Sequence, residues 1–157
     1  MKIIKLYGGQ KVKVDDWDYG TLKNYKWHMT GSGYAEVSRY MGNYKTVKTL
    51  MHQAIMWVSP GFQIDHINRD KLDNRKRNLR VATAQQNSWN HSIRSDNRSG
   101  AKGVSWDKGR EKWRADIYIT RGQPKLLGRF DSKTEAIEIY NEAAKEAFGE
   151  FAYLNKT

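Results

Sequence analysis

A polar and strongly basic segment, residues 64–87, constrains this chain more than any other feature of its sequence. Six lysine and arginine side chains lie in it, together with an adjacent aspartate and histidine and two later asparagines: Asp65, His66, Asn78 and Asn87. Its central part, residues 67–77, carries too few apolar side chains to form a core and should be an exposed loop. The composition suits a site that acts on a phosphodiester better than it suits a core.

The residues around this loop predict the order strand, loop, strand, helix. Residues 62–65, FQID, are expected to form one short strand and residues 78–82, NLRVA, the other. Thr83 and Gln86 have the spacing of a capping box, so a helix should begin there and carry Asn87 on its second turn.

An apolar stretch, LMHQAIMWV at residues 50–58, precedes the first strand and has a helical pattern that Ser59-Pro60-Gly61 would end. His52 is its only ionisable residue. A histidine in such surroundings is more often a packing residue than a ligand, so the pattern alone assigns His52 no role.

The charge balance favours a polyanionic partner. The chain has 157 residues and a net charge of +11, with 28 Lys and Arg against 17 Asp and Glu. Nucleic acid is the leading candidate. An anionic membrane is the rival, but it would need a long apolar span or a basic amphipathic helix, and neither is found in the sequence. The N-terminus lacks the pattern of a secretory signal, so an intracellular, non-secreted protein of one or two small domains is expected.

The chain contains no cysteine, which excludes disulfides and the common Cys-containing zinc sites. A metal would have to be held by histidine, carboxylate and amide groups. Oxygen-rich ligands suit Mg²⁺ or Mn²⁺, although a nitrogen ligand would admit other divalent ions. A structural zinc held by His52, His66 and His91 is an alternative, but their spacing matches no tight ligand set, so no structural zinc is expected.

Hydrolysis of a phosphodiester needs a base to activate water and a cation to stabilise the charge that develops on phosphorus and on the leaving oxygen. His66 can be the base if an acceptor fixes its tautomer, and Asn78 could supply that acceptor through its side-chain or backbone carbonyl. Asp65 lies on the other side of the strand from His66, where it could share one divalent ion with Asn87. Four nearby basic residues would hold the flanking phosphates: Arg75, Lys76, Arg77 and Arg80.

The first fifty residues are expected to form a small β-rich unit. Short strand patterns, separated by Gly, Asn and Asp, occur at residues 2–7, 11–14, 26–29, 33–40 and 44–50. A possible short helix lies between the second and third of them, with Trp17, Leu22 and Trp27 around it. The unit is interpreted as a packing module for these side chains; a platform for the DNA backbone is the alternative, because nine basic and four acidic residues precede residue 52.

After Asn90 the chain becomes polar and rich in Ser, Asn, Gly and Arg, which predicts a basic linker over residues 92–101 in which Arg94 and Arg98 could contact phosphates. Three strand patterns follow at residues 104–106, 112–120 and 125–130. A second capping box, Ser132 to Glu135, opens a helix that Gly149 would end. These signals predict a three-stranded antiparallel sheet covered on one face by one helix.

The middle strand of this sheet alternates apolar and polar side chains. Trp113, Ala115, Ile117 and Ile119 would face the helix, and Arg114, Asp116, Tyr118 and Thr120 would face away. Residues 102–129 hold eight basic and three acidic side chains, whereas residues 131–157 hold three basic and six acidic ones. A basic sheet with an acidic helix behind it would direct the sheet toward DNA. An ordinary solvated sheet face is the alternative.

The pattern DHINRDKLDNRKRNLRVATAQQN resembles the HNH family of ββα-metal nucleases, in its phage and intron-encoded homing endonuclease branch, over residues 52–90. The resemblance implies that His66 is the general base, that Asn78 orients it, and that Asp65 and Asn87 bind the metal. Asn87 stands at the position of the last His of the HNH motif. This replacement looks like the branch of the family that binds a single metal ion and no zinc. MHQAI also looks like an upstream MHR segment of phage members, which adds His52 to the candidate catalytic residues.

The C-terminal segment, SGAKGVSWDKGREKWRADI with LGRFDSKTEAIEIYNEAAKEAFGEFAYLN, resembles the AP2 DNA-binding domain of phage endonucleases and plant transcription factors. In that family the three-stranded sheet enters the major groove. Ser105 and Asp107 stand where plant members often carry Arg, so plant sequence preference is not transferred. The expected DNA contacts are Lys102, Lys108, Arg110, Arg114, Tyr118 and Lys125.

Together these inferences predict an α+β protein in four parts: a β-rich unit (1–51), a ββα-metal nuclease core (52–91), a basic linker (92–101) and an AP2-like sheet packed on one helix (102–157). The expected function is a homing-type, Mg²⁺- or Mn²⁺-dependent endonuclease that nicks or cuts double-stranded DNA. By the resemblance it would leave 5′-phosphate and 3′-hydroxyl ends. A non-catalytic, sequence-specific DNA-binding regulator is the alternative. We expect a monomer or weak dimer with no obligate protein partner, in the bacterial cytoplasm if phage-encoded.

Overall fold

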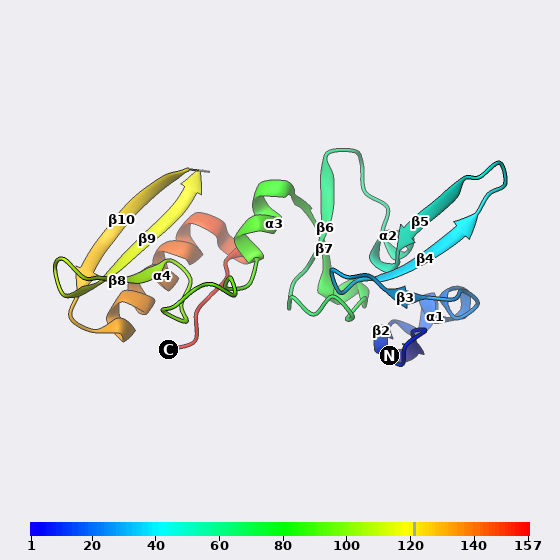
Figure 1. Ribbon diagram of the computed structural model, residues 1–157, viewed down its shortest axis with the longest axis horizontal. Coiled ribbons are helices and arrows are strands. Elements are labelled where there is room, and N and C mark those ends of the chain that lie inside the picture. The colour runs from blue at the N-terminus through cyan, green and yellow to red at the C-terminus, as the bar shows by residue number, and fades with distance from the viewer. Residues whose placement is uncertain (121) are drawn as a thin grey trace. The chain divides into compact units, whose positions relative to one another are not determined.

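The computed structural model describes residues 1–120 and 122–157 and confirms a mixed α+β fold. By its contacts the chain forms two compact units, Met1–Asn87 and Ser88–Thr157, which are coloured blue to green and green to red in Figure 1. The sequence-based division into four parts stays a prediction. The expected N-terminal unit and the polar motif share the first compact unit, and the expected linker lies in the second. Within the described residues, no helix is long and apolar enough to cross a membrane.

The first unit begins with small antiparallel sheets, as the strand patterns predicted. Strands β1 (Lys2–Lys5) and β2 (Lys11–Val14) form a hairpin, and helix α1 (Asp16–Leu22) follows. A three-stranded sheet in the order β3-β4-β5 is made by β3 (His28–Met29), β4 (Ala35–Tyr40) and β5 (Thr46–Leu50). Helix α2 (Met51–Ile55) is shorter than the apolar pattern suggested and ends before Ser59-Pro60-Gly61.

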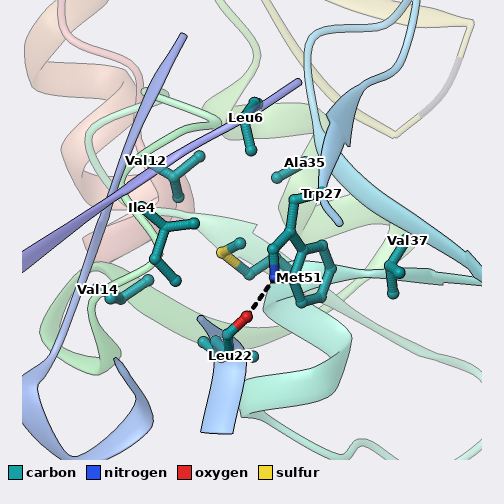
Figure 2. Packing of buried hydrophobic residues seen from close by; sticks show 9 residues of the cluster. All are labelled: Ile4, Leu6, Val12, Val14, Leu22, Trp27, Ala35, Val37 and Met51. Carbon is teal, nitrogen blue, oxygen red and sulfur yellow. Dashed lines mark hydrogen bonds between the residues drawn. The ribbon is translucent and has the colours of Figure 1, made fainter. Parts of the chain in front are cut away.

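The hydrophobic core of the first unit lies in this N-terminal part. Figure 2 shows nine buried side chains drawn from β1, β2, β4 and the segments around them: Ile4, Leu6, Val12, Val14, Leu22, Trp27, Ala35, Val37 and Met51. The Trp27 Nε1 donates to the Leu22 carbonyl at 2.7 Å, so the largest core side chain is also satisfied as a donor. The packing interpretation is confirmed for Leu22 and Trp27. It is wrong for Trp17, which is 93% exposed.

The polar motif folds as predicted into a hairpin and a helix. Strands β6 (Phe62–His66) and β7 (Leu79–Thr83) pair antiparallel, with a short 3₁₀ turn, η1 (Lys76–Asn78), before β7. Helix α3 (Ala84–Asn90) begins at the expected capping box: the Gln86 amide donates to the Thr83 hydroxyl at 3.2 Å, and the Gln86 side chain accepts from the Thr83 amide at 2.8 Å. The boundary between the two units falls inside α3, after Asn87.

The second unit contains the predicted sheet and helix. Strands β8 (Val104–Asp107), β9 (Lys112–Thr120) and β10 (Gln123–Phe130) pair antiparallel in the order β10-β9-β8. Helix α4 (Lys133–Phe148) lies across one face of this sheet (Figure 1), and the short turn η2 (Gly149–Phe151) follows. Ser132 caps α4, and Gly149, at a φ of 54°, ends it.

The core of the second unit is apolar and continuous between sheet and helix. It contains Ala101, Val104, Ala115, Ile117, Ala136, Ile137, Tyr140, Ala144 and Phe148. Gly103 is needed beside it: its φ is 72°, and a Cβ there would lie 2.1 Å from the Tyr140 ring. The predicted alternation on β9 holds for Ala115 and Ile117, which are buried, whereas Ile119 near the end of the strand is exposed.

The residues expected to form a linker are ordered by their own polar groups. The Asn97 side chain donates to the Ala101 carbonyl at 3.0 Å and accepts from the Gly100 amide at 2.7 Å. Ala101 is buried in the core of the second unit. The Ser- and Asn-rich composition here therefore reflects a network of side-chain to backbone hydrogen bonds.

Candidate functional site

The β6–β7 hairpin places Asp65 directly opposite Arg80. The Asp65 Oδ2 accepts from Arg80 Nε at 2.8 Å and lies 2.7 Å from a terminal nitrogen of the same guanidinium. Gln63 precedes Asp65 by two residues and so lies on the same side of the strand. The Gln63 Oε1 accepts from the Asn87 Nδ2 at 2.7 Å, which brings α3 to this side of the hairpin. Asn87 therefore lies on the Gln63 side of the hairpin, and the expectation that Asp65 and Asn87 share one metal ion stays a prediction.

His66 is buried at the end of β6, in contact with groups from three other segments. Its Nε2 lies 3.3 Å from the Asn74 Oδ1, and its ring centroid lies 5.2 Å from that of His52 and 5.9 Å from that of Tyr34. Burial lowers the pKa of His66, while the Asn74 hydrogen bond and nearby carboxylates act in the opposite direction. The imidazole is therefore held in its neutral form, which can accept a proton.

His52 lies beside His66 rather than apart from it. The two rings meet edge to face at an interplanar angle of 86°, and the Tyr34 ring centroid is 5.2 Å from that of His52. Burial, followed by the neighbouring His66, lowers the pKa of His52 to about 4. His52 is thus a neutral, tightly packed residue in contact with the candidate base, which is more than its apolar surroundings in the sequence revealed.

The loop between β6 and β7 is exposed at six of residues 67–77, as its composition suggested, but Asp73 and Asn74 at its centre are buried because its polar groups satisfy one another. Asp73 is fully buried and accepts from Arg75 Nε at 2.6 Å, from a terminal nitrogen of Arg75, and from Asn68 Nδ2 at 3.1 Å. These bonds, with that of Arg75 the strongest, lower the pKa of Asp73 and keep it ionised. Asn74 and Asn78 are buried as well. These buried polar side chains thus form a small interior that is stabilised by hydrogen bonds.

Strand β2 forms two backbone hydrogen bonds with this loop. The Lys13 amide donates to the Leu72 carbonyl, and the Asn74 amide donates to the Lys13 carbonyl, both at 2.8 Å. Leu72 packs against the N-terminal core. The N-terminal part thus fixes the backbone on both sides of Asp73, and with it the Asn74 side chain that reaches His66.

Asn78 orders the hairpin around His66. Its Nδ2 donates to the Asp73 carbonyl at 2.8 Å, its Oδ1 accepts from the Asn68 amide at 3.0 Å, and its carbonyl accepts from the Ile67 amide at 2.9 Å. The expected contact that fixes the His66 tautomer through Asn78 stays a prediction. The Nε2 contact belongs to Asn74.

The four basic residues of the motif differ in what they already contact. Arg75 is paired with Asp73, and Arg80 with Asp65. The Lys76 Nζ lies 3.3 Å from Asp18 Oδ1 but remains largely exposed. Arg77 is exposed. Lys76 and Arg77 are therefore better disposed to reach a phosphate than Arg75 and Arg80, whose guanidiniums neutralise buried carboxylates.

The basic residues expected to contact DNA in the second unit also differ. Arg114 is paired with Asp116 at 2.7 Å, Arg110 with Asp107 at 3.6 Å, and Arg94 with Asp96 at 2.9 Å. Lys102 Nζ donates to the carbonyls of Trp89 and His91. Lys125 pairs across the sheet with Ile117, which faces the helix. Six of the expected contacts are exposed, whether or not they are paired: Arg94, Arg98, Lys108, Arg110, Tyr118 and Lys125.

A divalent metal fits the donor chemistry of Asp65 and Asn87, one carboxylate and one amide. Mg²⁺ and Mn²⁺ accept such oxygen donors and usually retain several waters. Across residues 1–120 and 122–157, no group of three or more His, Asp or Glu side chains could enclose a metal ion. A metal would therefore be held by few protein ligands, and Arg80 competes with it for the Asp65 carboxylate.

Sequence reasoning missed two contacts of His66, Asn74 and Tyr34. Asn74 lay inside the quoted motif but was one of several polar residues in a presumed loop. Tyr34 comes from the N-terminal strands, more than thirty positions before His66, and no local pattern connects the two.

The fold and site together define a β-hairpin closed by a helix, with an acid and a neutral histidine at the end of its first strand. Residues 58–89 match a family model described as HNH endonuclease. The chain is 34% identical, over 146 residues, to "Uncharacterized HNH endonuclease L560" of Acanthamoeba polyphaga mimivirus. The aligned region covers 92% of this chain and 73% of that protein. It is 35% identical over 95 residues to "Protein 3.8" of Escherichia phage T7, covering 60% of this chain and 77% of that protein.

The chain therefore belongs to the HNH endonuclease family, and its expected nuclease class is supported. Nucleases of this family generally depend on a divalent metal and act on DNA. No solved structure shows significant similarity to the chain. The resemblance of the second unit to the AP2 domain stays a prediction.

Proposed function

We propose that this protein is a Mg²⁺- or Mn²⁺-dependent homing-type endonuclease that hydrolyses double-stranded DNA at the site formed by Asp65, His66 and Asn87. The observation that carries the proposal is the position of His66, which is buried, with its Nε2 at 3.3 Å from the Asn74 Oδ1, inside the segment that matches the HNH family. Burial also lowers the pKa of His66, which favours the neutral imidazole. A neutral imidazole beside a phosphodiester can remove a proton from water, which makes the nucleophile.

The surroundings of His66 favour one tautomer. The Asn74 Nδ2 donates to the Lys71 carbonyl at 3.3 Å, so the amide oxygen of Asn74 is the atom turned toward His66 Nε2. An oxygen acceptor at Nε2 favours a proton on that nitrogen. Nδ1 then becomes the basic nitrogen that takes the proton from water. Asn78 would also support this arrangement, because its bonds to residues 67, 68 and 73 hold the loop that carries Asn74.

Asp65 and Asn87 would hold the divalent ion. When bound, the ion supplies Lewis-acid stabilisation of the charge that develops on the phosphorus and the leaving 3′ oxygen. Arg80 would then leave the Asp65 carboxylate, at least in part, and its guanidinium would turn to a neighbouring phosphate, where a bidentate contact is strong. Lys76 and Arg77 would hold flanking phosphates.

The direct test is cleavage of supercoiled plasmid DNA in Mg²⁺ or Mn²⁺ by the wild type and by His66→Ala. The wild type should produce nicked or linear DNA, and His66→Ala should cut at least a hundredfold more slowly while binding DNA equally well. His91→Ala, which removes an exposed histidine of the second unit, is the matched control and should cut normally. If wild type and His66→Ala both bind and neither cuts, the protein is a DNA-binding regulator instead.

The products give a second check on the same proposal. A hydrolytic cut should leave 5′-phosphate and 3′-hydroxyl ends that DNA ligase can reseal without prior treatment. A single site in one chain cuts one strand at a time, so a monomer should nick before it linearises the plasmid. Ends that ligase cannot join would exclude this chemistry even if cleavage occurs.

We also propose that the second unit, in the manner of an AP2 domain, supplies most of the sequence preference, because a site that mainly contacts phosphates can read little sequence. Deleting residues 100–157 should weaken DNA binding and reduce its dependence on salt while leaving some nonspecific cutting. The deletion removes Phe148, on which Trp89 stacks, so Trp89→Ser should be included to keep the truncated protein from aggregating. Unchanged affinity and cleavage pattern would contradict this role.

A further inference from the structure

Tyr34 brings the N-terminal part of the chain to the candidate active site. Its ring contacts both histidines, with centroids 5.2 Å from His52 and 5.9 Å from His66. Lys71 Nζ lies over the same ring, 4.7 Å from its centroid. Residues from the N-terminal sheet, α2, β6 and the polar loop therefore meet around one tyrosine.

The backbone of Tyr34 is fixed in the turn immediately before β4. Its amide donates to the Thr30 Oγ1 at 3.0 Å, and its carbonyl accepts from the Thr30 amide at 2.8 Å. Lys71 Nζ also donates to the Ser32 carbonyl at 2.8 Å, which ties this turn to the polar loop. The next residue, Ala35, is buried in the core. The ring is thus held beside His66 by elements that do not depend on a bound ligand.

The hydroxyl of Tyr34 is not used inside the protein. Among residues 1–120 and 122–157, no group is hydrogen-bonded to this oxygen. The oxygen is also absent from the set of polar atoms in these residues that are both buried and without a partner, so it is not buried. The hydroxyl of this half-buried side chain therefore reaches solvent. Burial and the negative charge of Asp65 raise the pKa of the Tyr34 phenol, so the group keeps its proton and remains a donor.

A protonated phenol that reaches solvent beside the candidate base can donate to a bound substrate in place of water, and a phosphodiester offers charged oxygen acceptors. We propose that the Tyr34 hydroxyl donates a hydrogen bond to a nonbridging oxygen of the scissile phosphodiester, which makes Tyr34 a further catalytic residue. The inference rests on the proposed function, since it assumes that the phosphate lies beside His66. It gives the N-terminal part a role in the reaction in addition to support of the polar loop.

Tyr34→Phe tests this role because it removes the oxygen and keeps the ring against both histidines. Loss of a donor to a charged transition state typically lowers the rate by about tenfold to a hundredfold. We expect that loss in kcat for cleavage of supercoiled plasmid in Mn²⁺, with the melting temperature and metal-free DNA affinity unchanged. Tyr25→Phe is the matched control: Tyr25 is also half-buried, lies against an aromatic ring, Trp27, and has a cation, Arg39, over its face.

The outcomes separate the two proposals. A Tyr34→Phe rate within twofold of wild type overturns the role of the hydroxyl, and a simultaneous loss in Tyr34→Ala would show that only the ring matters. A wild type that never cuts overturns the proposed function itself and this inference with it. Loss in Tyr25→Phe as large as in Tyr34→Phe would also overturn it, because the effect would then be a general one of removing hydroxyls from this unit.

A second measurement does not depend on how well the variant folds. Once the cut position is mapped, each nonbridging oxygen of the scissile phosphate is replaced by sulfur, and the ratio of oxygen to sulfur cleavage rates is measured in each protein. If Tyr34 donates to one of these oxygens, Tyr34→Phe should reduce that ratio severalfold for one diastereomer. Equal ratios in wild type and Tyr34→Phe for both diastereomers would overturn the proposal.

Discussion

The two compact units differ in the interactions that stabilise each of them internally. In the second unit, one apolar core between sheet and helix orders the chain from Ala101 to Phe148. In the first unit the apolar core lies in the N-terminal part, and the motif around Asp65 and His66 is ordered mainly by hydrogen bonds among buried polar groups. A network of buried polar groups is stabilising only when every group has a hydrogen-bond partner. One substitution in the network around Asp73 should therefore lower the free energy of unfolding by more than the loss of one small side chain would suggest.

The largest effect should come from Asp73→Ala in the first unit. Removing the buried carboxylate leaves Arg75 unpaired and takes an acceptor from Asn68. Breaking such a pair typically costs about 3–5 kcal/mol, and we expect this loss in the free energy of unfolding of residues 1–87. Urea unfolding followed by hydrogen exchange of peptides from each unit will measure it.

The chain offers a matched control for Asp73. Arg94 and Asp96 form an ion pair with the same two-residue spacing, but both side chains are exposed. Asp96→Ala should therefore change the free energy of unfolding far less than Asp73→Ala, because water screens an exposed ion pair. Equal losses in the two variants would mean that burial of the polar loop does not distinguish the first unit.

Phe148→Ala is the corresponding change in the second unit. The Phe148 ring stacks on Trp89 with centroids 4.5 Å apart and is buried in the core. Loss of a buried phenylalanine typically costs about 3 kcal/mol or more, and the loss should be confined to residues 88–157 in the same exchange experiment. Leu154→Ala, at a half-exposed position, is the control and should cost much less. Equal loss of protection in residues 1–87 would show that α3 transmits the damage across the boundary.

The difference between the units also explains what the sequence could predict. In the second unit the signals are local: alternation on β9, the cap at Ser132 and the glycine at position 149 each act within a few residues. The Thr83 capping box and the strands β6 and β7 were predicted for the same reason. The nuclease class was predictable as well, because the residues around Asp65 and His66 form a recognisable local pattern, and residues 58–89 match the HNH endonuclease family.

The surroundings of the motif were not predictable, because they depend on contacts between distant segments. The buried centre of the loop depends on β2, whose Lys13 backbone bonds to Leu72 and Asn74, and no local pattern in the polar loop indicates that contact. Arg80 looks like a phosphate ligand in the sequence, but it neutralises Asp65, which the pairing of β6 with β7 brings opposite to it. Tyr34 reaches His66 only through the arrangement of the N-terminal sheet.

The buried histidines of the first unit should also make its stability depend on pH. His52 has a pKa of about 4 in the folded protein against an ordinary value of 6.5, so the unfolded chain binds a proton between these values and the folded chain does not. Stability is therefore full above about pH 6.5 and is lost as the pH falls toward 4. The shift corresponds to at most about 3 kcal/mol.

His52→Gln isolates this effect from the titration of carboxylates. The His66 ring and the Tyr34 phenol face His52, and the lowered pKa of His66 adds pH dependence of the same sign in both proteins. Urea unfolding at pH 7.5, 5.5 and 4.5 should show a smaller loss of stability in His52→Gln than in wild type. Parallel curves would mean that His52 is protonated in the folded protein without cost.

The smallest expected effect concerns the second unit and its binding to DNA. Lys108 is exposed in the turn between β8 and β9, whereas Arg114 on β9 holds Asp116. A lysine that neutralises one phosphate contributes about 0.9 to the slope of log affinity against log salt concentration. Lys108→Ala should reduce that slope by about this amount. Arg114→Ala should change it less, because a guanidinium held by a carboxylate releases few counterions from DNA. An equal change in both variants would show that the Arg114–Asp116 pair opens on DNA, and the outer face of the sheet would then be the surface that contacts it.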